Sequence, residues 1–141
     1  MATAFKIAKP AVNFIHPDDM PDQYALKALG DCTTPVLCDG VLIVCDKRVD
    51  PEPDDIVSLI FTQEVAQRRG IAGLVKKLAI ALPPWNMGGD AMGLAVVDQL
   101  NPPRQYCIPT TNLLAVHKVI GTAESCGDGQ ARFRPSQAAP R

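Results

Sequence analysis

Two short stretches of the chain carry side chains that could act together as a nucleophile and a base. Cys32 lies in the polar turn Gly30-Asp31-Cys32-Thr33, which leads through an Asp-Gly turn into an apolar run. Lys76 interrupts a second apolar run, 71–82. Because burial disfavours the charged form of an amine, a lysine inside such a run can accept a thiol proton. These residue types predict a hydrolase of the Cys/Lys kind.

The identity of the base and the reactivity of the thiol each leave an alternative open. Alternation along a strand points one of Lys76 and Lys77 inward, and we prefer Lys76 as the base. Both lysines could instead lie on an edge strand, where positive charge discourages aggregation. Cys32 could be an active nucleophile or a small residue at a site that has lost catalysis.

The remaining polar and sulfur-containing residues are expected to have structural roles. Cysteine packs as a small hydrophobic residue, so three more cysteines are assigned to the core: Cys38, Cys45 and Cys107. Asp31 and Asp39 are expected to make local hydrogen bonds in turns.

Two histidines and one tryptophan complete the set of candidate residues. We expect His16 to be solvated and His117 to be a satisfied or surface histidine rather than a catalytic one. Trp85 follows two prolines, so this loop either covers the core or docks a partner.

Composition excludes several classes of protein. The chain has 141 residues, a length typical of one domain, and a formal net charge of −1, which does not favour direct nucleic-acid binding. Its five cysteines form no C-x-x-C pair, so we expect neither a metal site nor a disulfide framework, and no cofactor. No secretory segment or membrane span is evident, which favours the cytoplasm.

The elements that must position these residues are expected to be short strands, because 13 prolines argue against long helices. Residues 1–23 read as an extended arm with at most one short strand near 12–15, and residues 123–141 as a disordered tail. Segment 24–30 is compatible with a helix or a strand, and 62–70 reads as a hairpin loop. Strands are predicted at 41–45, 56–61, 71–82, 94–97, 106–108 and 113–121. The pattern predicts an all-β barrel or sandwich.

The order of these motifs resembles the C-terminal domains of LexA-type repressors, lambda-class phage repressors and the UmuD mutagenesis protein. These domains form a family of self-cleaving Ser/Lys peptidases with a signal-peptidase-like fold. The resemblance covers about 24–122 and rests on four pieces: Gly30-Asp31-Cys32 with Asp39-Gly40, the strand 41–46, Val75-Lys76-Lys77-Leu78, and the Asn-Pro turn with strand 113–121. It implies a mainly β fold of short, strongly bent strands with little helix, and it favours a strand at 24–30.

The resemblance also implies roles for individual residues. Cys32 takes the place of the family's serine, Lys76 supplies the general base, and the backbone N–H groups of Asp31 and Cys32 stabilise the oxyanion. The family's Ala-Gly or Cys-Gly cleavage bond does not occur in residues 1–31, so self-cleavage is expected to be impaired. No helix-turn-helix is expected in residues 1–23, since they show no amphipathic helical period.

The function that the resemblance implies is a stand-alone, self-associating regulatory domain in bacterial or phage gene regulation and the DNA-damage response. The expected partners are a second copy of the chain, which binds through 113–121, and a repressor, a polymerase or a RecA-type filament protein. The alternative is an active Cys/Lys peptidase that cuts itself or a partner chain.

Overall fold

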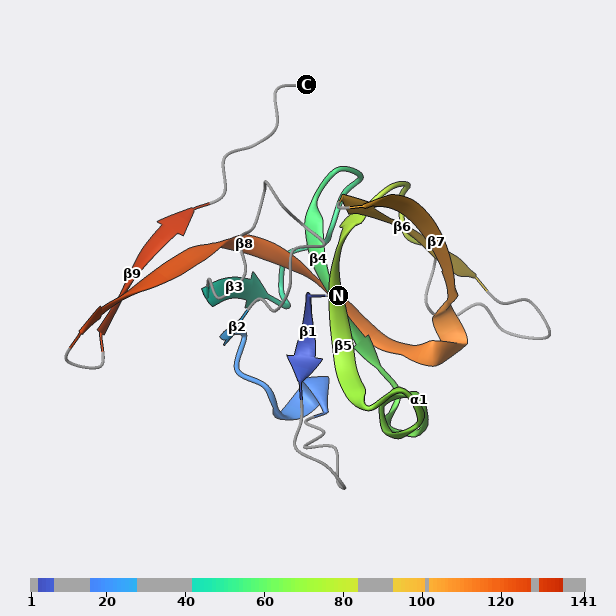
Figure 1. The fold of residues 1–141 in the computed structure, drawn as a ribbon, viewed down its shortest axis with the longest axis horizontal. Helices are drawn as coiled ribbons and strands as arrows, with labels where there is room; N and C mark the ends of the chain where they lie inside the picture. The colour runs from blue at the N-terminus through green and yellow to red at the C-terminus, as the bar shows by residue number, and fades with distance from the viewer. Residues whose placement is uncertain are drawn as a thin grey trace.

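The computed structural model describes residues 3–6, 16–27, 42–83, 93–100, 102–127 and 130–135, and these are mainly β (Figure 1). One antiparallel sheet contains nine strands, listed here in chain order: β1 (Thr3–Lys6), β2 (Gln23–Lys27), β3 (Leu42–Asp46), β4 (Ile56–Phe61), β5 (Ile71–Leu78), β6 (Leu94–Leu100), β7 (Pro103–Pro109), β8 (Leu113–Gly127) and β9 (Gln130–Pro135). A single α-helix, α1 (Gln63–Arg69), and two short 3₁₀ turns, η1 (Pro17–Asp19) and η2 (Thr110–Asn112), complete the described part.

The strand order places the long strand β8 in the interior of the sheet. The order is β2-β3-β8-β4-β5-β6-β7, with β1 paired to β5 and β9 paired to β8. Figure 1 shows β4 to β7 curling on one side of the molecule, whereas β8 runs across it and its last part extends away on the other side together with β9. None of the helices in the described residues is both long and apolar enough to cross a membrane.

Several strands lie where the sequence predicts them. Strand β4 has the predicted bounds, and β3 is displaced from the predicted 41–45 by one residue. The ambiguous segment near Tyr24 is a strand over Gln23–Lys27, because it pairs along its whole length with β3. Strands β6 and β7 are longer than predicted, since they pair with each other from Leu94–Pro109 to Leu100–Pro103.

The prediction of a hairpin loop at 62–70 is wrong, because this segment contains α1. Thr62 caps the helix by accepting a hydrogen bond from the N–H of Val65 at 3.4 Å. Gly70 ends it in the left-handed conformation, with φ at 75°, which glycine adopts without steric cost. Val65 and Ala66 are buried, so one side of the helix packs on the sheet.

Both ends of the chain differ from the sequence-based expectation. Strand β8 continues to Gly127 and β9 returns along it, so residues 123–135 contain strands where a disordered tail is predicted. The pairing uses backbone hydrogen bonds, which small and polar residues provide as well as apolar ones do. In the arm, β1 lies at Thr3–Lys6, and the predicted strand at 12–15 falls outside the described residues.

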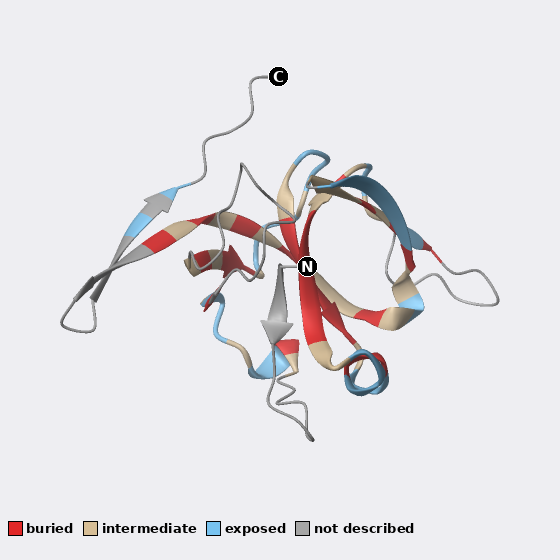
Figure 2. Ribbon diagram, in the orientation of Figure 1, coloured by how far each residue is buried: buried red, intermediate tan, exposed pale blue. Residues whose placement is uncertain are grey.

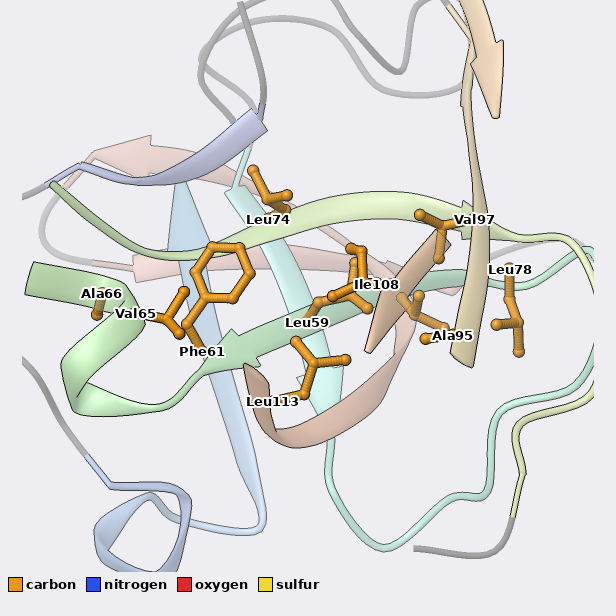
Figure 3. Packing of buried hydrophobic residues seen from close by; sticks show 11 residues of the cluster. Leu59, Phe61, Val65, Ala66, Leu74, Leu78, Ala95, Val97, Ile108 and Leu113 are labelled. Carbon is orange, nitrogen blue, oxygen red and sulfur yellow. The ribbon is translucent and has the colours of Figure 1, made fainter. Parts of the chain in front are cut away.

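Two apolar clusters lie on the sheet and hold it together. The main cluster joins α1 to strands β4 to β8 and includes Leu59, Phe61, Leu74 and Ile108 (Figure 3). The smaller cluster joins β2, β3, β5 and β8. Leu74 belongs to the main cluster and Val75 to the smaller one, so β5 is buried on both faces, as its red colour in Figure 2 shows. Each fully buried large apolar side chain contributes about 1.5–3 kcal/mol.

Candidate functional site

Lys76 is the polar residue of β5 that the structure buries most deeply. Only 2 % of it is exposed, and strand alternation places it on the same face as Leu74 and Leu78 of the main cluster. Lys77 lies on the other face, where its Nζ is 3.4 Å from Oδ1 of Asp54. The inward lysine is therefore Lys76, and the role of base stays a prediction.

A neighbouring amide holds the ammonium end of Lys76. Its Nζ donates to Oε1 of Gln99 on β6, at 3.3 Å. Nε2 of Gln99 in turn donates to the carbonyl oxygen of Pro102, at 3.0 Å. This chain of hydrogen bonds fixes the orientation of the Gln99 amide, so an oxygen faces the lysine.

Lys76 also lies where the neighbours of β5 change along one edge. Strand β4 pairs with one edge of β5 from Ile56–Lys77 to Ile60–Gly73. On the other edge, β1 pairs with the first part of β5, up to Thr3–Val75, and β6 pairs from Lys77–Asp98 onward. Lys76 lies between these two pairings, so the strand that is paired to this edge of β5 changes from β1 to β6 at this residue.

A pocket of about 260 Å³ opens next to this lysine. Its walls come from β5, β6, β7, η2 and the last residue of α1, and they combine apolar side chains with cations and amides. The described residues that line it are Arg69, Leu74, Lys76, Val97, Gln99, Tyr106, Cys107, Ile108, Pro109 and Asn112. The buried lysine therefore borders an open pocket.

The other half of the predicted dyad falls outside the described residues. Cys32 lies there, together with Asp31, whose N–H is the second predicted oxyanion donor. Cys38, Asp39 and Trp85 also belong to segments that the structure does not describe. The structure thus describes part of the surroundings of Lys76, and the pairing with Cys32 stays a prediction.

The prediction that Cys107 packs in the core is wrong. Cys107 is a free, exposed cysteine on β7, next to the buried Ile108. Strand β7 ends the strand order, and its residues from Pro103 to Cys107 are all exposed, as the pale blue ribbon in Figure 2 shows. Edge position explains the difference, because an apolar residue on an outer strand has a neighbour on one side only. Cys45, by contrast, is buried as predicted.

A second polar group lies inside the sheet, on β2, β3, β4 and β8. The hydroxyl of Tyr24 hydrogen-bonds Nδ1 of His117 at 2.9 Å and donates to Oγ of Ser58 at 3.4 Å. The rings of Tyr24 and His117 meet edge to face, 5.6 Å apart. Ser58 and His117 are direct cross-strand partners, and so are Tyr24 and Cys45. His117 is therefore a satisfied histidine, as the sequence predicts.

Burial determines how the groups of this second cluster ionise. Burial raises the pKa of Tyr24 far above its usual value and raises the pKa of Cys45 to about 12. Burial lowers the pKa of His117, and the positive charge of Lys47 lowers it further. All three side chains are thus neutral near pH 7, which suits a structural cluster better than a nucleophilic one.

Sequence reasoning missed Ser58, although a serine inside the apolar run 56–61 is a visible signal.

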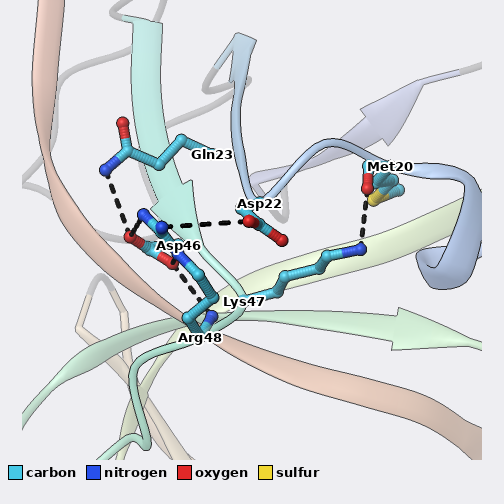
Figure 4. A network of polar contacts seen from close by, with 6 residues as sticks. All are labelled: Met20, Asp22, Gln23, Asp46, Lys47 and Arg48. Atoms are coloured by element: carbon cyan, nitrogen blue, oxygen red, sulfur yellow. Dashed lines mark hydrogen bonds and ion pairs between the residues drawn. The ribbon is translucent and has the colours of Figure 1, made fainter.

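A third polar group ties the segment before β2 to the end of β3 (Figure 4). The buried carboxylate of Asp46 accepts hydrogen bonds from Arg48 at 2.9 Å and from Gln23 at 3.1 Å. The hydrogen bonds from Arg48 hold the pKa of Asp46 well below its usual value. Lys47 donates to the carbonyl oxygen of Met20 at 2.7 Å. These contacts anchor a turn and leave no group directed at a ligand.

His16 begins the 3₁₀ turn that this anchor holds. Its Nδ1 accepts a hydrogen bond from the N–H of Asp18 at 3.1 Å. His16 thus acts as a capping residue in a partly exposed position. Within the described ranges, no group of three or more histidine, cysteine or acidic side chains is arranged to hold a metal ion.

Comparison with known proteins gives no relative: no family model, no curated protein and no solved structure matches this chain significantly. The functional argument therefore rests on the residues of the chain and on their geometry.

Proposed function

We propose that this chain is a LexA/UmuD-like domain that hydrolyses a peptide bond with Cys32 as nucleophile and Lys76 as general base. The observation that carries the proposal is the position of Lys76, which is 2 % exposed and lines an open pocket. Burial of an ammonium group costs several kcal/mol, which favours the neutral amine that a general base requires. Gln99 supplies a neutral oxygen, which accepts a hydrogen bond from the charged and from the neutral form of the amine.

The proposed reaction has two steps. The neutral amine of Lys76 takes the thiol proton of Cys32, and the thiolate attacks the peptide carbonyl carbon. The backbone N–H groups of Asp31 and Cys32 hold the oxyanion, the C–N bond breaks, and Lys76 returns the proton to the leaving amine. Water then hydrolyses the thioester, which releases the acid and restores the thiol.

Intact mass measured over time at pH 7 and at about pH 10 tests this proposal. We expect cleavage in the wild type that speeds up at the higher pH, where the amine is neutral, and none in Cys32→Ala or Lys76→Ala. Lys77→Ala is the matched control, since the neighbouring lysine lies on the other face and should leave cleavage unchanged. Because the target of cleavage is either the chain itself or a partner, alkylation of Cys32 is measured in parallel. A wild type that stays intact and whose Cys32 reacts no faster than a model thiol contradicts the proposal.

The second candidate function is a self-associating regulatory domain that pairs with a second copy and controls a repressor, a polymerase or a RecA-type filament protein. The observation in its favour is the exposed strand β7, which has a strand neighbour on one side only in the described sheet. An unpaired strand edge is a template for pairing with another chain. Leu113–Gly121 is less suited to this role than predicted, because β8 lies in the interior of the strand order.

Sedimentation velocity between 1 and 100 µM separates this function from the first. A dimer that forms through β7 should also slow the alkylation of Cys107 as the protein concentration rises, because the exposed thiol becomes covered. Cys32→Ala should dimerise like the wild type. A chain that remains monomeric over this range contradicts the proposed self-association.

A further inference from the structure

The pocket beside Lys76 has a permanently charged cation in its lining. Arg69 lines it, and none of its described lining residues carries a carboxylate. We infer that this pocket binds the carboxylate of a peptide, with Arg69 as the ion-pair partner. This inference rests on the proposed peptidase function and names its substrate class: peptides with an acidic group near the bond that is cut.

The guanidinium of Arg69, an exposed residue, lies over an aromatic ring. Its Cζ lies 4.8 Å from the ring centroid of Phe61, which is fully buried. A stacked guanidinium keeps its N–H groups free at the rim of the plane, where a carboxylate can accept two of them. No carboxylate among the described residues forms an ion pair with Arg69.

Arg69, unlike the proposed base, can stay charged throughout the reaction and is therefore the cation that can bind an anion. The proposed base must be uncharged, and an anion bound directly to it would favour the charged form. An anion paired with the guanidinium of Arg69 favours the charged form of the lysine less than an anion bound to the amine itself. Asn112 also lines the pocket, and its carboxamide can donate a hydrogen bond. Its backbone carbonyl oxygen accepts a hydrogen bond from the N–H of Thr62 at 3.0 Å.

The size and the walls of the pocket indicate a peptide side chain. A volume of about 260 Å³ lies below the range of about 300–1,000 Å³ that is usual for small-molecule sites. Leu74, Val97 and Ile108 form apolar walls suited to the methylene groups of one residue. A carboxylate on a short aliphatic stem fits both features. It can come from a glutamate or aspartate side chain, or from the C-terminus of the peptide.

Binding of matched pentapeptides to Cys32→Ala tests the inference without any cleavage. The probes are acetyl-Ala-Ala-Glu-Ala-Ala-amide, its Gln counterpart, and acetyl-pentaalanine with a free carboxylate or an amide at the end. Chemical shifts of the side-chain amides of Asn112 and Gln99 report occupancy. We expect a Kd at least tenfold lower for a carboxylate peptide than for its neutral counterpart. The two pairs show whether a side chain or a C-terminus supplies the carboxylate.

Arg69→Gln should remove this preference, whereas Arg68→Gln, at the adjacent exposed position of α1 and outside the pocket lining, should keep it. Equal affinity of charged and neutral peptides, or no binding of either, overturns the inference. This comparison is made in a protein that keeps Arg69, so it does not depend on whether Arg69→Gln folds. Preference without cleavage in the mass experiment and without fast alkylation of Cys32 would leave the carboxylate site standing and refute the peptidase. Cleavage by a protein that shows no preference for carboxylate peptides would support the peptidase and refute the carboxylate site.

Discussion

The hydroxyl of Tyr24 on β2 lies 2.9 Å from Nδ1 of His117 on β8, although 93 residues separate the two in the chain. This hydrogen bond joins two strands that are not neighbours, because β3 lies between them in the sheet. Tyr24→Phe should therefore destabilise the fold by about 1–3 kcal/mol, since the imidazole loses its partner inside the sheet. Urea unfolding measures the loss. Tyr106→Phe, on the exposed strand β7, is the control and should change stability by less than about 0.5 kcal/mol.

His117 should make stability fall in mild acid. Its pKa is lowered in the folded state, chiefly by burial, so the unfolded chain binds its proton first as the pH drops. The stabilisation is complete above about pH 6.5, the ordinary pKa of histidine, and is lost as the pH falls toward the lower folded value. Urea midpoints at pH 7.5, 6 and 5 measure the trend. His117→Gln should flatten it between pH 7.5 and 5, and an unchanged slope in that variant would assign the loss to other groups.

Replacing Lys76 by methionine should separate stability from chemistry. Lys76→Met keeps the length of the side chain and removes the hydrogen bond to Oε1 of Gln99, so it should abolish cleavage while the free energy of unfolding changes by no more than about 1.5 kcal/mol. Lys77→Met loses only the surface ion pair with Asp54 and should stay within about 1 kcal/mol of the wild type. A marked destabilisation of Lys76→Met would show that the lysine holds the fold together.

Gly93 should not tolerate a side chain. A Cβ at this position would lie 2.5 Å from Cγ and 2.9 Å from Cβ of Pro83, and a proline ring has little freedom to move. Gly93→Ala should therefore cost about 1–3 kcal/mol, as overpacked sites do. Thermal unfolding measures the effect. Gly70→Ala also destabilises, but through its positive φ rather than through a contact, since nothing lies within 4 Å of the added Cβ.

Sequence reasoning succeeded where the hydrophobic pattern was regular. The run 56–61 is apolar except for Ser58 and is bounded by polar residues, and it forms β4 with the predicted ends. The two adjacent lysines illustrate the same point, because alternation alone predicts that one of them faces inward. The pattern could not say which one, since that depends on which face of β5 carries the main cluster.

The errors arose where tertiary contacts or caps outweighed composition. Segment 62–70 has a polar composition, and its cap signals at Thr62 and Gly70 were the evidence for a helix. Cys107 looked like a core residue because cysteine usually is, and only its place on an edge strand reveals its exposure. The pocket itself joins residues from 69 to 112, so no local pattern could have predicted it.

The interior place of β8 also sets the order in which the chain can fold. Strands β3 and β4 follow each other in the chain but never pair, since β8 lies between them. During synthesis, β3 and β4 should therefore each keep one strand edge unpaired until β8 leaves the ribosome. Pairing over such long sequence separations is slow, and open edges aggregate. This chain should thus fold late, after most of it has been made, and fragments that end before Leu113 should depend on chaperones to stay in solution.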